Sequence, residues 1–531
     1  MILPSKRELR SVVNGWVVVG LATAMFGSRE VCSVAETTVI LKPLPSEQTG
    51  LRAIIEKWKA DEMKRQGDRP GSHSWWPWGL ASFDYDNDGD MDLLAMQHGQ
   101  PRTMIIRNML KETGKLTFVN ANPELGLPTN ALAGCFKPMI WDFDGDGFLD
   151  LAYRDSAPET FFFNRQGKAF EAMRPGLGEV IGMKEVDGVD DNGLPFLVTT
   201  SARFFFDSGT RRFKREPWQP HWHAEPPAAI AALMREAKQK NRFFGTEFFE
   251  VNLGGRGRKD LAWGGFGPYG GPMLGRYLLA GDRGGFTDAT EQFGLPKEGT
   301  PIYFADFNGD GIDDVLVVHT KVGGVYLSDG KGRYALRHGP LTDFLRLPDS
   351  YLHTVRTVDL DNEGVLDLVL YSGRNGAVGT FQNLGGGEFR QVLKASGWTE
   401  PVAICDINDD GLMDVCVGGP GDDITIYLNE TPRAGTSCNL YPRVAKPNPF
   451  AVGARVQVFR VGQLGQPGAK PILDEKAHPD GTPIHVGLGS ERTFDLRVVF
   501  PGKVPKHVER QGVEAKKKIS IASSGHLEEI R

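Results

Sequence analysis

Cysteine is scarce in this chain, with five residues in 531. So few cysteines cannot form the disulfide framework of a small secreted domain, and no Cys-x-x-Cys pair is present to hold zinc or haem. No apolar run of about 20 residues follows the first 35 residues, so we expect no membrane span in that part of the chain. The net charge of −6 offers no basic surface to nucleic acid, and we expect no such partner.

Common catalytic signatures are also missing. The chain contains neither Gly-x-Ser-x-Gly nor His-Glu-x-x-His. Residues 265–270 match Gly-x-Gly-x-x-Gly, but Pro268 and the lack of a strand–helix context indicate a turn. Nothing in these motifs identifies an enzyme.

The first 35 residues have the pattern of an export signal. Lys6, Arg7 and Arg10 precede a short apolar stretch, and small residues before Ala35 predict cleavage there. A retained membrane anchor is the competing interpretation. Both place the rest of the chain outside the cytoplasm, in a secreted, extracellular or periplasmic location.

The negative charge is concentrated in acidic repeats within residues 36–438. Residues 439–531 carry a formal charge of +6, whereas residues 36–438 carry −14. Five segments share the pattern Asp-x-Asp/Asn-x-Asp/Glu-Gly-x-x-Asp: 84–92, 142–150, 306–314, 359–367 and 406–414. Two degenerate copies, 188–196 and 252–260, lie in the gap between 150 and 306.

These seven copies predict a repeat fold. They begin about 54 residues apart on average, and short β-branched or aliphatic runs follow most of them. Three or four strands per unit, repeated seven times, are typical of a β-propeller. We therefore expect an all-β fold with a seven-bladed β-propeller over 75–438, calcium loops and few short helices.

The loop pattern predicts calcium sites, because calcium prefers six to eight hard oxygen ligands. Glycine at position 6 supplies the positive φ that lets the backbone wrap around an ion. We expect about five structural ions and none at the degenerate copies. The predicted ligands, at positions 1, 3, 5, 7 and 9, are Asp84, Asp86, Asp88, Asp90 and Asp92; Asp142, Asp144, Asp146, Phe148 and Asp150; Asp306, Asn308, Asp310, Ile312 and Asp314; Asp359, Asp361, Glu363, Val365 and Asp367; and Asp406, Asn408, Asp410, Leu412 and Asp414.

Other interpretations of these loops are weaker. An EF-hand requires a glutamate at position 12 and flanking helices, and neither is expected here. Magnesium usually retains several waters instead of using an all-protein cage. Solvated acidic turns without metal remain the competing interpretation.

Two other features lie near the last loop. Cys405 and Cys416 flank this loop on neighbouring strands and form either a disulfide or two buried thiols. Asn429-Glu-Thr431 is a glycosylation sequon, which the following Pro432 weakens.

The loops resemble FG-GAP/VCBS propeller repeats, and residues 284–295 resemble the segment between blades of that family. The tail, with Asn448-Pro-Phe450, His485-Val-Gly487 and Phe500-Pro-Gly502, resembles the ASPIC/UnbV domain, which implies a small β domain over 439–531. Together they resemble the cartilage acidic protein type of secreted protein. The resemblance implies a calcium-binding, non-catalytic module for binding, adhesion or scaffolding. An extracellular polysaccharide lyase or hydrolase acting through the propeller face is the alternative.

Two segments outside the loops complete the sequence-based expectations. Apolar residues recur at helical spacing over 50–65, within an N-terminal extension of residues 36–74. A second helix is expected over 225–242, as an insertion between the degenerate loops. Insertions on rigid scaffolds often carry binding residues, so we expect contact with an extracellular protein or carbohydrate at Trp218, His221, Trp222 and His223.

Overall fold

The computed structural model describes most of the chain between residues 37 and 530. The described ranges are 37–66, 77–97, 103–127, 139–153, 160–173, 189–190, 196–198, 202–217, 245–255, 259–266, 274–281, 285–347, 353–372, 376–397, 402–419, 423–432 and 434–530. The export signal, the insertion at 225–242 and the four expected partner contacts at 218–223 lie outside these ranges, as does most of loop 188–196.

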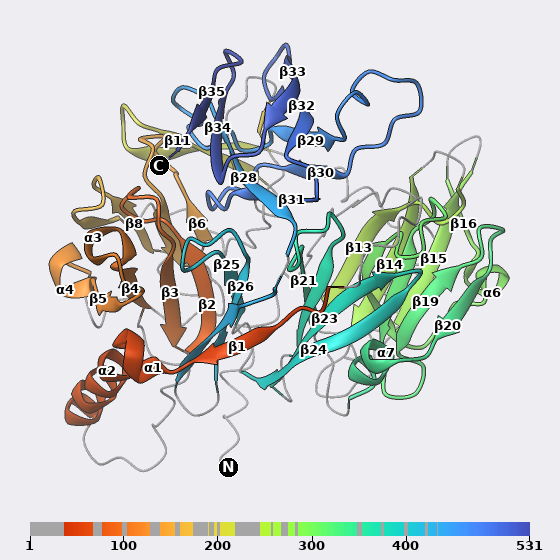
Figure 1. Ribbon diagram of the computed structural model, residues 1–531, viewed down its shortest axis with the longest axis horizontal. Helices are drawn as coiled ribbons and strands as arrows, with labels where there is room; N and C mark the ends of the chain where they lie inside the picture. The colour runs from red at the N-terminus through yellow and green to blue at the C-terminus, as the bar shows by residue number, and fades with distance from the viewer. Residues whose placement is uncertain are drawn as a thin grey trace.

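The fold is all-β, with seven sheets in chain order across residues 41–429 (Figure 1). Within the described ranges, six of these sheets have four strands and the third has three. The strands are β2–β5 (Pro77–Phe83, Asp92–Gln97, Thr103–Asn108, Phe118–Asn120), β6–β9 (Met139–Trp141, Asp150–Tyr153, Thr160–Asn164, Phe170–Met173), β10–β12 (Leu197–Val198, Ala202–Asp207, Arg212–Pro217), β13–β16 (Gly245–Val251, Asp260–Phe266, Leu274–Ala280, Phe286–Asp288), β17–β20 (Thr300–Ala305, Asp314–Val318, Gly324–Ser328, Tyr334–Arg337), β21–β24 (His353–Val358, Asp367–Ser372, Ala377–Gly385, Glu388–Ser396), and β25–β27 (Val402–Cys405, Asp414–Gly418, Ile424–Asn429) with β1 (Leu41–Leu44).

The inner strands β8, β18 and β26 are buried along their whole length. Apart from a polar residue at one or both ends, they read as continuous apolar runs, because both of their faces are covered. Neighbouring sheets supply that cover: one apolar core joins the first three sheets, and three others join the fourth with the fifth, the fifth with the sixth and the sixth with the seventh.

The first sheet also packs against the last. Leu93 and Ile106 share a core with Cys405 and Cys416, and β2 contacts β25 and β26. In addition, β1 pairs antiparallel with β27, so the beginning of the described chain completes the last sheet. The sequence interpretation left residues 41–44 outside the repeats, and the structure corrects this assignment.

Helices are few and short in the described ranges. The helix expected over 50–65 is α2 (Leu51–Gln66), whose Leu51 and Ile55 are buried against the first and last sheets. The others are single turns or little more: α1 (Ser46–Thr49), α3 (Leu110–Thr113), α4 (Asn122–Leu125), α6 (Thr290–Phe293) and α7 (Pro340–Leu345). None of the helices in the described ranges has the length and hydropathy needed to cross a bilayer.

The C-terminal part consists of two further four-stranded sheets that share one apolar core. It begins at Thr436, three residues before the expected boundary. Its strands, blue in Figure 1, gather on one side of the molecule, and β28 and β31 extend toward the other sheets. They are β28 (Thr436–Arg443), β31 (Ile484–Gly489), β34 (Lys518–Ala522) and β35 (Leu527–Glu529), and β29 (Arg455–Phe459), β30 (Leu473–Lys476), β32 (Thr493–Phe500) and β33 (Lys506–Glu514).

Candidate metal sites in the acidic loops

Each of the five acidic loops connects the first and second strands of its sheet, as expected. Glycine at position 6 has a φ between 85° and 97° in all five, a region that favours glycine. Position 4 also adopts positive φ, which the sequence interpretation did not anticipate. The residues there are Asn87, Gly145, Gly309, Asn362 and Asp409.

The first aspartate of each loop holds the turn together. In the second loop, Asp142 accepts hydrogen bonds from the backbone N–H groups of Asp146 (2.9 Å) and Gly147 (2.8 Å). Asp306, Asp359 and Asp406 accept equivalent bonds. These backbone hydrogen bonds therefore help to define the shape of the loop.

The last aspartate of each loop has a structural role that the ligand pattern alone did not reveal. Asp92 Oδ2 accepts from the backbone N–H of Tyr85 (3.2 Å), and Oδ1 accepts from that of Asn108 (2.8 Å) at the end of the third strand. Asp150, Asp314, Asp367 and Asp414 make the same pair of bonds.

The degenerate loop 252–260 keeps this pair of hydrogen bonds, because the carboxylate of Asp260 accepts from the backbone N–H groups of Leu253 and Ala280. Its third and fifth positions have no carboxylate. The last aspartate can therefore be retained for the fold even where the other ligands are lost.

Three of the five loops bring carboxylates close enough to share an ion. The oxygens of Asp84, Asp86 and Asp92 lie within 4.8 Å of one another, as do those of Asp142, Asp144 and Asp146, and those of Asp359, Asp361 and Asp367. Several of these oxygens are buried and accept no hydrogen bond: Asp84 Oδ1, Asp86 Oδ1, Asp144 Oδ1 and Asp361 Oδ1. Because a buried carboxylate oxygen is costly to leave without a partner, these donor sets fit a hard divalent cation.

The other two predicted sites have asparagine at position 3 and show no such carboxylate triad. The amide nitrogen of Asn308 donates to the backbone carbonyl of Ser328 (2.9 Å), and that of Asn408 donates to Asp410 Oδ2 (2.9 Å). An asparagine carbonyl is a neutral ligand for calcium. These two loops therefore offer less negative charge to an ion than the other three.

Burial and mutual repulsion raise the carboxylate pKa values in the loops. Burial, and next the charges of Asp88 and Asp86, raises the pKa of Asp84 to about 7. Burial raises the pKa of Asp142 to about 7, although backbone N–H groups oppose the rise. Burial and the charge of Glu363 raise the pKa of Asp361 to about 6. Each carboxylate is thus costly to ionise without a cation, as expected for a site that gains free energy by binding one.

Side-chain partners at position 3 differ between sheets. Arg107 Nη2 lies 2.9 Å from Asp86 Oδ2, and Arg165 Nη1 lies 2.9 Å from Asp144 Oδ2. In the sixth sheet a neutral partner replaces the guanidinium, because Gln382 Nε2 donates to Asp361 Oδ2 (2.9 Å). Each partner fixes one oxygen of the position-3 carboxylate and leaves the other free.

Sequence reasoning missed a recurring asparagine at the end of the third strand. Asn164 Nδ2 donates to the carbonyl of Leu149 in its own loop (3.1 Å) and to that of Tyr85 in the preceding sheet (2.7 Å). Asn429 does the same with Met413 and Leu360. Asn429, the asparagine of the glycosylation sequon, is only 1% exposed, and its amide nitrogen makes these two hydrogen bonds. Its side chain is therefore not available to carry a glycan in this structure.

Asn108 makes the equivalent bond between the first sheet and the last. Its Nδ2 donates to the carbonyl of Ile407 (2.9 Å), which lies in the loop of the seventh sheet. The recurrence of Asn before a turn, at 108, 164, 383 and 429, is the sequence signal that could have identified these residues.

The C-terminal sheets lie against the acidic loops. Lys518 has a side chain that is only 7% exposed, and its ammonium contacts Asp409 Oδ1 (3.0 Å) and donates to the carbonyl of Gly89. His485 Nε2 lies 2.8 Å from Asn362 Oδ1. A Cβ at Gly487 would lie 1.8 Å from Asp359 Oδ2, so only glycine fits there. His485-Val-Gly487 is thus a docking segment for the loop at 359–367.

The second loop makes a similar close approach to the tail. A Cβ on Gly145 would lie 2.6 Å from the carbonyl oxygen of Pro447, and Phe450 packs in the same core as Leu149. The tail segment 448–450 therefore has a packing role, and the basic tail lies against the acidic loops.

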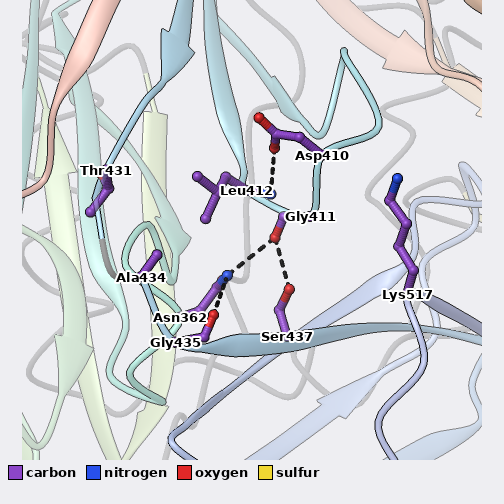
Figure 2. Close-up of a pocket in the computed structure, with 9 residues that line it drawn as sticks. All are labelled: Asn362, Asp410, Gly411, Leu412, Thr431, Ala434, Gly435, Ser437 and Lys517. Carbon is purple, nitrogen blue, oxygen red and sulfur yellow. Dashed lines mark hydrogen bonds between the residues drawn. The ribbon is translucent and has the colours of Figure 1, made fainter.

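A polar cavity of about 430 Å³ opens where the acidic loops of the sixth and seventh sheets meet the C-terminal sheets (Figure 2). Asn362 Nδ2 and Ser437 Oγ both donate to the carbonyl of Gly411, at 3.1 and 2.7 Å, and Lys517 lies on the opposite side of the cavity. The hydrogen bonds between these groups connect the loops of the sixth and seventh sheets to β28.

Cys405, Cys416 and Cys438 are buried free thiols. Cys405 and Cys416 lie on the paired strands β25 and β26, and in this structure the two-thiol alternative is the one adopted.

Comparison with known proteins identifies one repeat. Residues 306–370 match the FG-GAP-like repeat, and they run from the loop before β18 to the middle of β22. No curated protein sequence matches the chain.

Two solved structures show distant likeness. An Agrocybe aegerita lectin that recognises non-reducing terminal N-acetylglucosamine is 18% identical, with 60% of this chain and 79% of the lectin covered and a TM-score of 0.32. The Photorhabdus luminescens Tc holotoxin pore is 16% identical, with 81% of this chain but only 18% of that one covered and a TM-score of 0.28. At TM-scores this low, neither likeness bears on function.

Proposed function

We propose that this protein is an exported calcium-binding module with a binding, adhesion or scaffold role, in which calcium is structural. The observation that carries the proposal is the convergence of buried carboxylates with unpartnered oxygens in repeated loops of one design. The FG-GAP-like repeat at 306–370 is consistent with a binding or scaffold module.

The proposed architecture is a closed seven-bladed propeller with an ASPIC/UnbV-like domain docked on its calcium loops. Supporting it are the seven consecutive sheets, the core shared by the first and last, and the bond from Asn108 to the carbonyl of Ile407. The positive tail lying against negative loops supports the docked arrangement.

In this proposal the residues of the loops hold the ion and the ion offsets their repulsion. Positions 1 and 9 shape the turn through backbone hydrogen bonds, and positions 1 and 3 supply carboxylate oxygens to the ion in all three triads. A ligand that binds only the native state stabilises it by RT ln(1 + [L]/Kd), about 2.7 kcal/mol per site at 100 times Kd. Chelation should therefore lower the melting temperature while the apolar cores keep the fold.

Metal analysis and calorimetry under saturating calcium test the metal part of the proposal. We expect about one ion per acidic loop and a melting temperature that falls with EDTA and recovers with added calcium. Two or fewer ions, or a melting temperature indifferent to EDTA, would refute it. A variant with Asp359 and Asp361 both changed to asparagine serves as a control that should lose one ion.

The binding role needs a separate measurement. Immobilised protein is incubated with the extracellular fraction of its source, with calcium or with EDTA, and captured proteins and glycans are identified. Alanine at Trp218, His221, Trp222 and His223 should abolish capture without changing the ion count. Conversion of an offered polysaccharide to product at catalytic rates would instead favour an enzyme.

A further inference from the structure

The first sheet carries a second group of carboxylates beside its loop. Oxygens of Asp88, Asp90 and Glu112 lie within 4.8 Å of one another. Asp88 and Asp90 belong to the loop, whereas Glu112 comes from α3, beyond the third strand. This group shares no residue with the triad of Asp84, Asp86 and Asp92, so the five aspartates that the sequence pattern assigned to one ion fall into two groups in the structure.

Two oxygens in this second group are buried without a hydrogen bond. Asp90 is only 2% exposed, and its Oδ2 accepts from the backbone N–H of Lys111 (3.0 Å) while Oδ1 has no hydrogen-bond partner. Asp88 Oδ1 accepts from the N–H of Asp90 (3.0 Å), and its Oδ2 is likewise buried without one. Glu112 is exposed, so the group is open to solvent on one side.

The other sheets do not repeat this arrangement. Asp90 is at loop position 7, where the second loop has Phe148. Glu112 lies four residues after the recurring asparagine of the third strand, and the corresponding residue of the second sheet is Lys168. In the fifth, sixth and seventh sheets the same two positions hold Ile312 and Gly332, Val365 and Gly387, and Leu412 and Arg433.

We propose that Asp88, Asp90 and Glu112 bind a second divalent cation, of calcium type, next to the ion of the first loop. Three carboxylates with one solvent-facing side suit calcium, which completes its six to eight ligands with water. The inference rests on the proposed function only in that both ions share the loop 84–92.

Arg107 is the internal competitor for this ion. Its Nη2 lies 2.5 Å from Glu112 Oε1 and 3.9 Å from Asp88 Oδ2, as well as 2.9 Å from Asp86 Oδ2. Two like charges at about 4 Å repel strongly where the surroundings are less polar than water. Removing the guanidinium should therefore tighten cation binding on both sides of it.

The test counts calcium ions by equilibrium dialysis and metal analysis at saturating calcium. Glu112→Gln should bind one ion fewer than the parent protein. Glu124→Gln is the matched control, because Glu124 also faces Arg107, at 3.9 Å from Nη1, but lies outside the group. It should leave the count unchanged, and far-ultraviolet circular dichroism should show both variants folded.

A double variant separates the two neighbouring ions. Asp86→Asn should remove the ion of the first triad, so Asp86→Asn with Glu112→Gln should lose two ions if the sites are distinct and one if they are not. Arg107→Met should lower the dissociation constant of the weakest ion at least tenfold. An unchanged count in Glu112→Gln overturns the second site while the loop ions stand, whereas a parent protein without calcium overturns both proposals.

Discussion

The ammonium of Lys518 lies 3.0 Å from Asp409 Oδ1, across the boundary between the C-terminal sheets and the loop of the seventh sheet. Lys517 lies 3.1 Å from Oδ2 of the same residue. Burial alone would raise the pKa of Asp409, but these two cations lower it below its usual value. Lys517 and Lys518 thus join the C-terminal sheets to the acidic loop of the seventh sheet.

Lys518→Met should destabilise the protein by about 2 kcal/mol, because it removes a buried ammonium that contacts Asp409 and the carbonyl of Gly89, although Lys517 still faces Asp409. Lys516→Met is the matched control, since Lys516 pairs with the exposed Glu514. Its effect should be small, as for most exposed pairs. Denaturant unfolding measures both, and equal losses would show that the buried contact has no special weight.

Asn164→Ala should cost about 3 kcal/mol. It removes two donations to buried carbonyls and the acceptor for the N–H of Gly167 (2.8 Å). The control is Asn120→Ala, at an exposed residue whose Oδ1 accepts only from the N–H of Asn122 (3.0 Å) among the bonds described. We expect a loss below about 1 kcal/mol there. Similar values for the two would contradict the bridging role between sheets.

Asp84→Asn and Asp260→Asn should respond oppositely to calcium. Asp84→Asn should lower the melting temperature in calcium but raise it in EDTA, because it removes a buried repelling charge. Asp260→Asn should lose about 2 kcal/mol in either condition, since it breaks backbone bonds in a loop without a carboxylate triad. A calcium-dependent effect at Asp260 would show that the degenerate loop binds metal.

The metal-free protein should become more stable on mild acidification. The folded pKa values of Asp84 and Asp142 are raised to about 7 from an ordinary 3.8, so the folded state binds more protons than the unfolded state between about pH 4 and 7. Stability in EDTA should therefore fall as pH rises through this window.

His485 acts in the opposite direction, because burial lowers its pKa to about 4 and it opposes protonation below pH 6.5. Thermal melts at pH 5.5 and 8 in EDTA, with His485→Gln as a control, measure the balance. In excess calcium the order should reverse, since protons compete with the ion. A metal-free protein that is less stable at pH 5.5 than at pH 8 would contradict the assignment.

The repeating loops allowed the sheets and the position of each acidic loop between its first two strands to be predicted, because Asp-x-Asp-x-Asp-Gly-x-x-Asp is local and recurs. Non-local relationships were not readable in the same way. Residues 41–44 pair with Asn429 and its neighbours nearly 390 positions away, and a strand of four residues containing Pro43 carries little signal. Glu112 joins Asp88 and Asp90 only because α3 follows the third strand.

The last aspartate shows that a motif can predict a residue without revealing all of its roles. Its presence in all five loops suggested a ligand, yet Asp260 persists in a loop that has lost the other carboxylates. The backbone N–H groups around it explain this persistence, and they become visible only when the first and third strands are placed side by side.

The pairing of β1 with β27 also sets the order in which the chain can mature. Residues 41–44 emerge early in synthesis, but their partner strand emerges after nearly 390 more residues. Until β27 is synthesised, β1 has no strand to pair with, and the first and last sheets cannot form their shared core. The seven-sheet body should therefore reach its final state late and in one step, so a nascent chain that stops before residue 424 should remain sensitive to protease at its beginning.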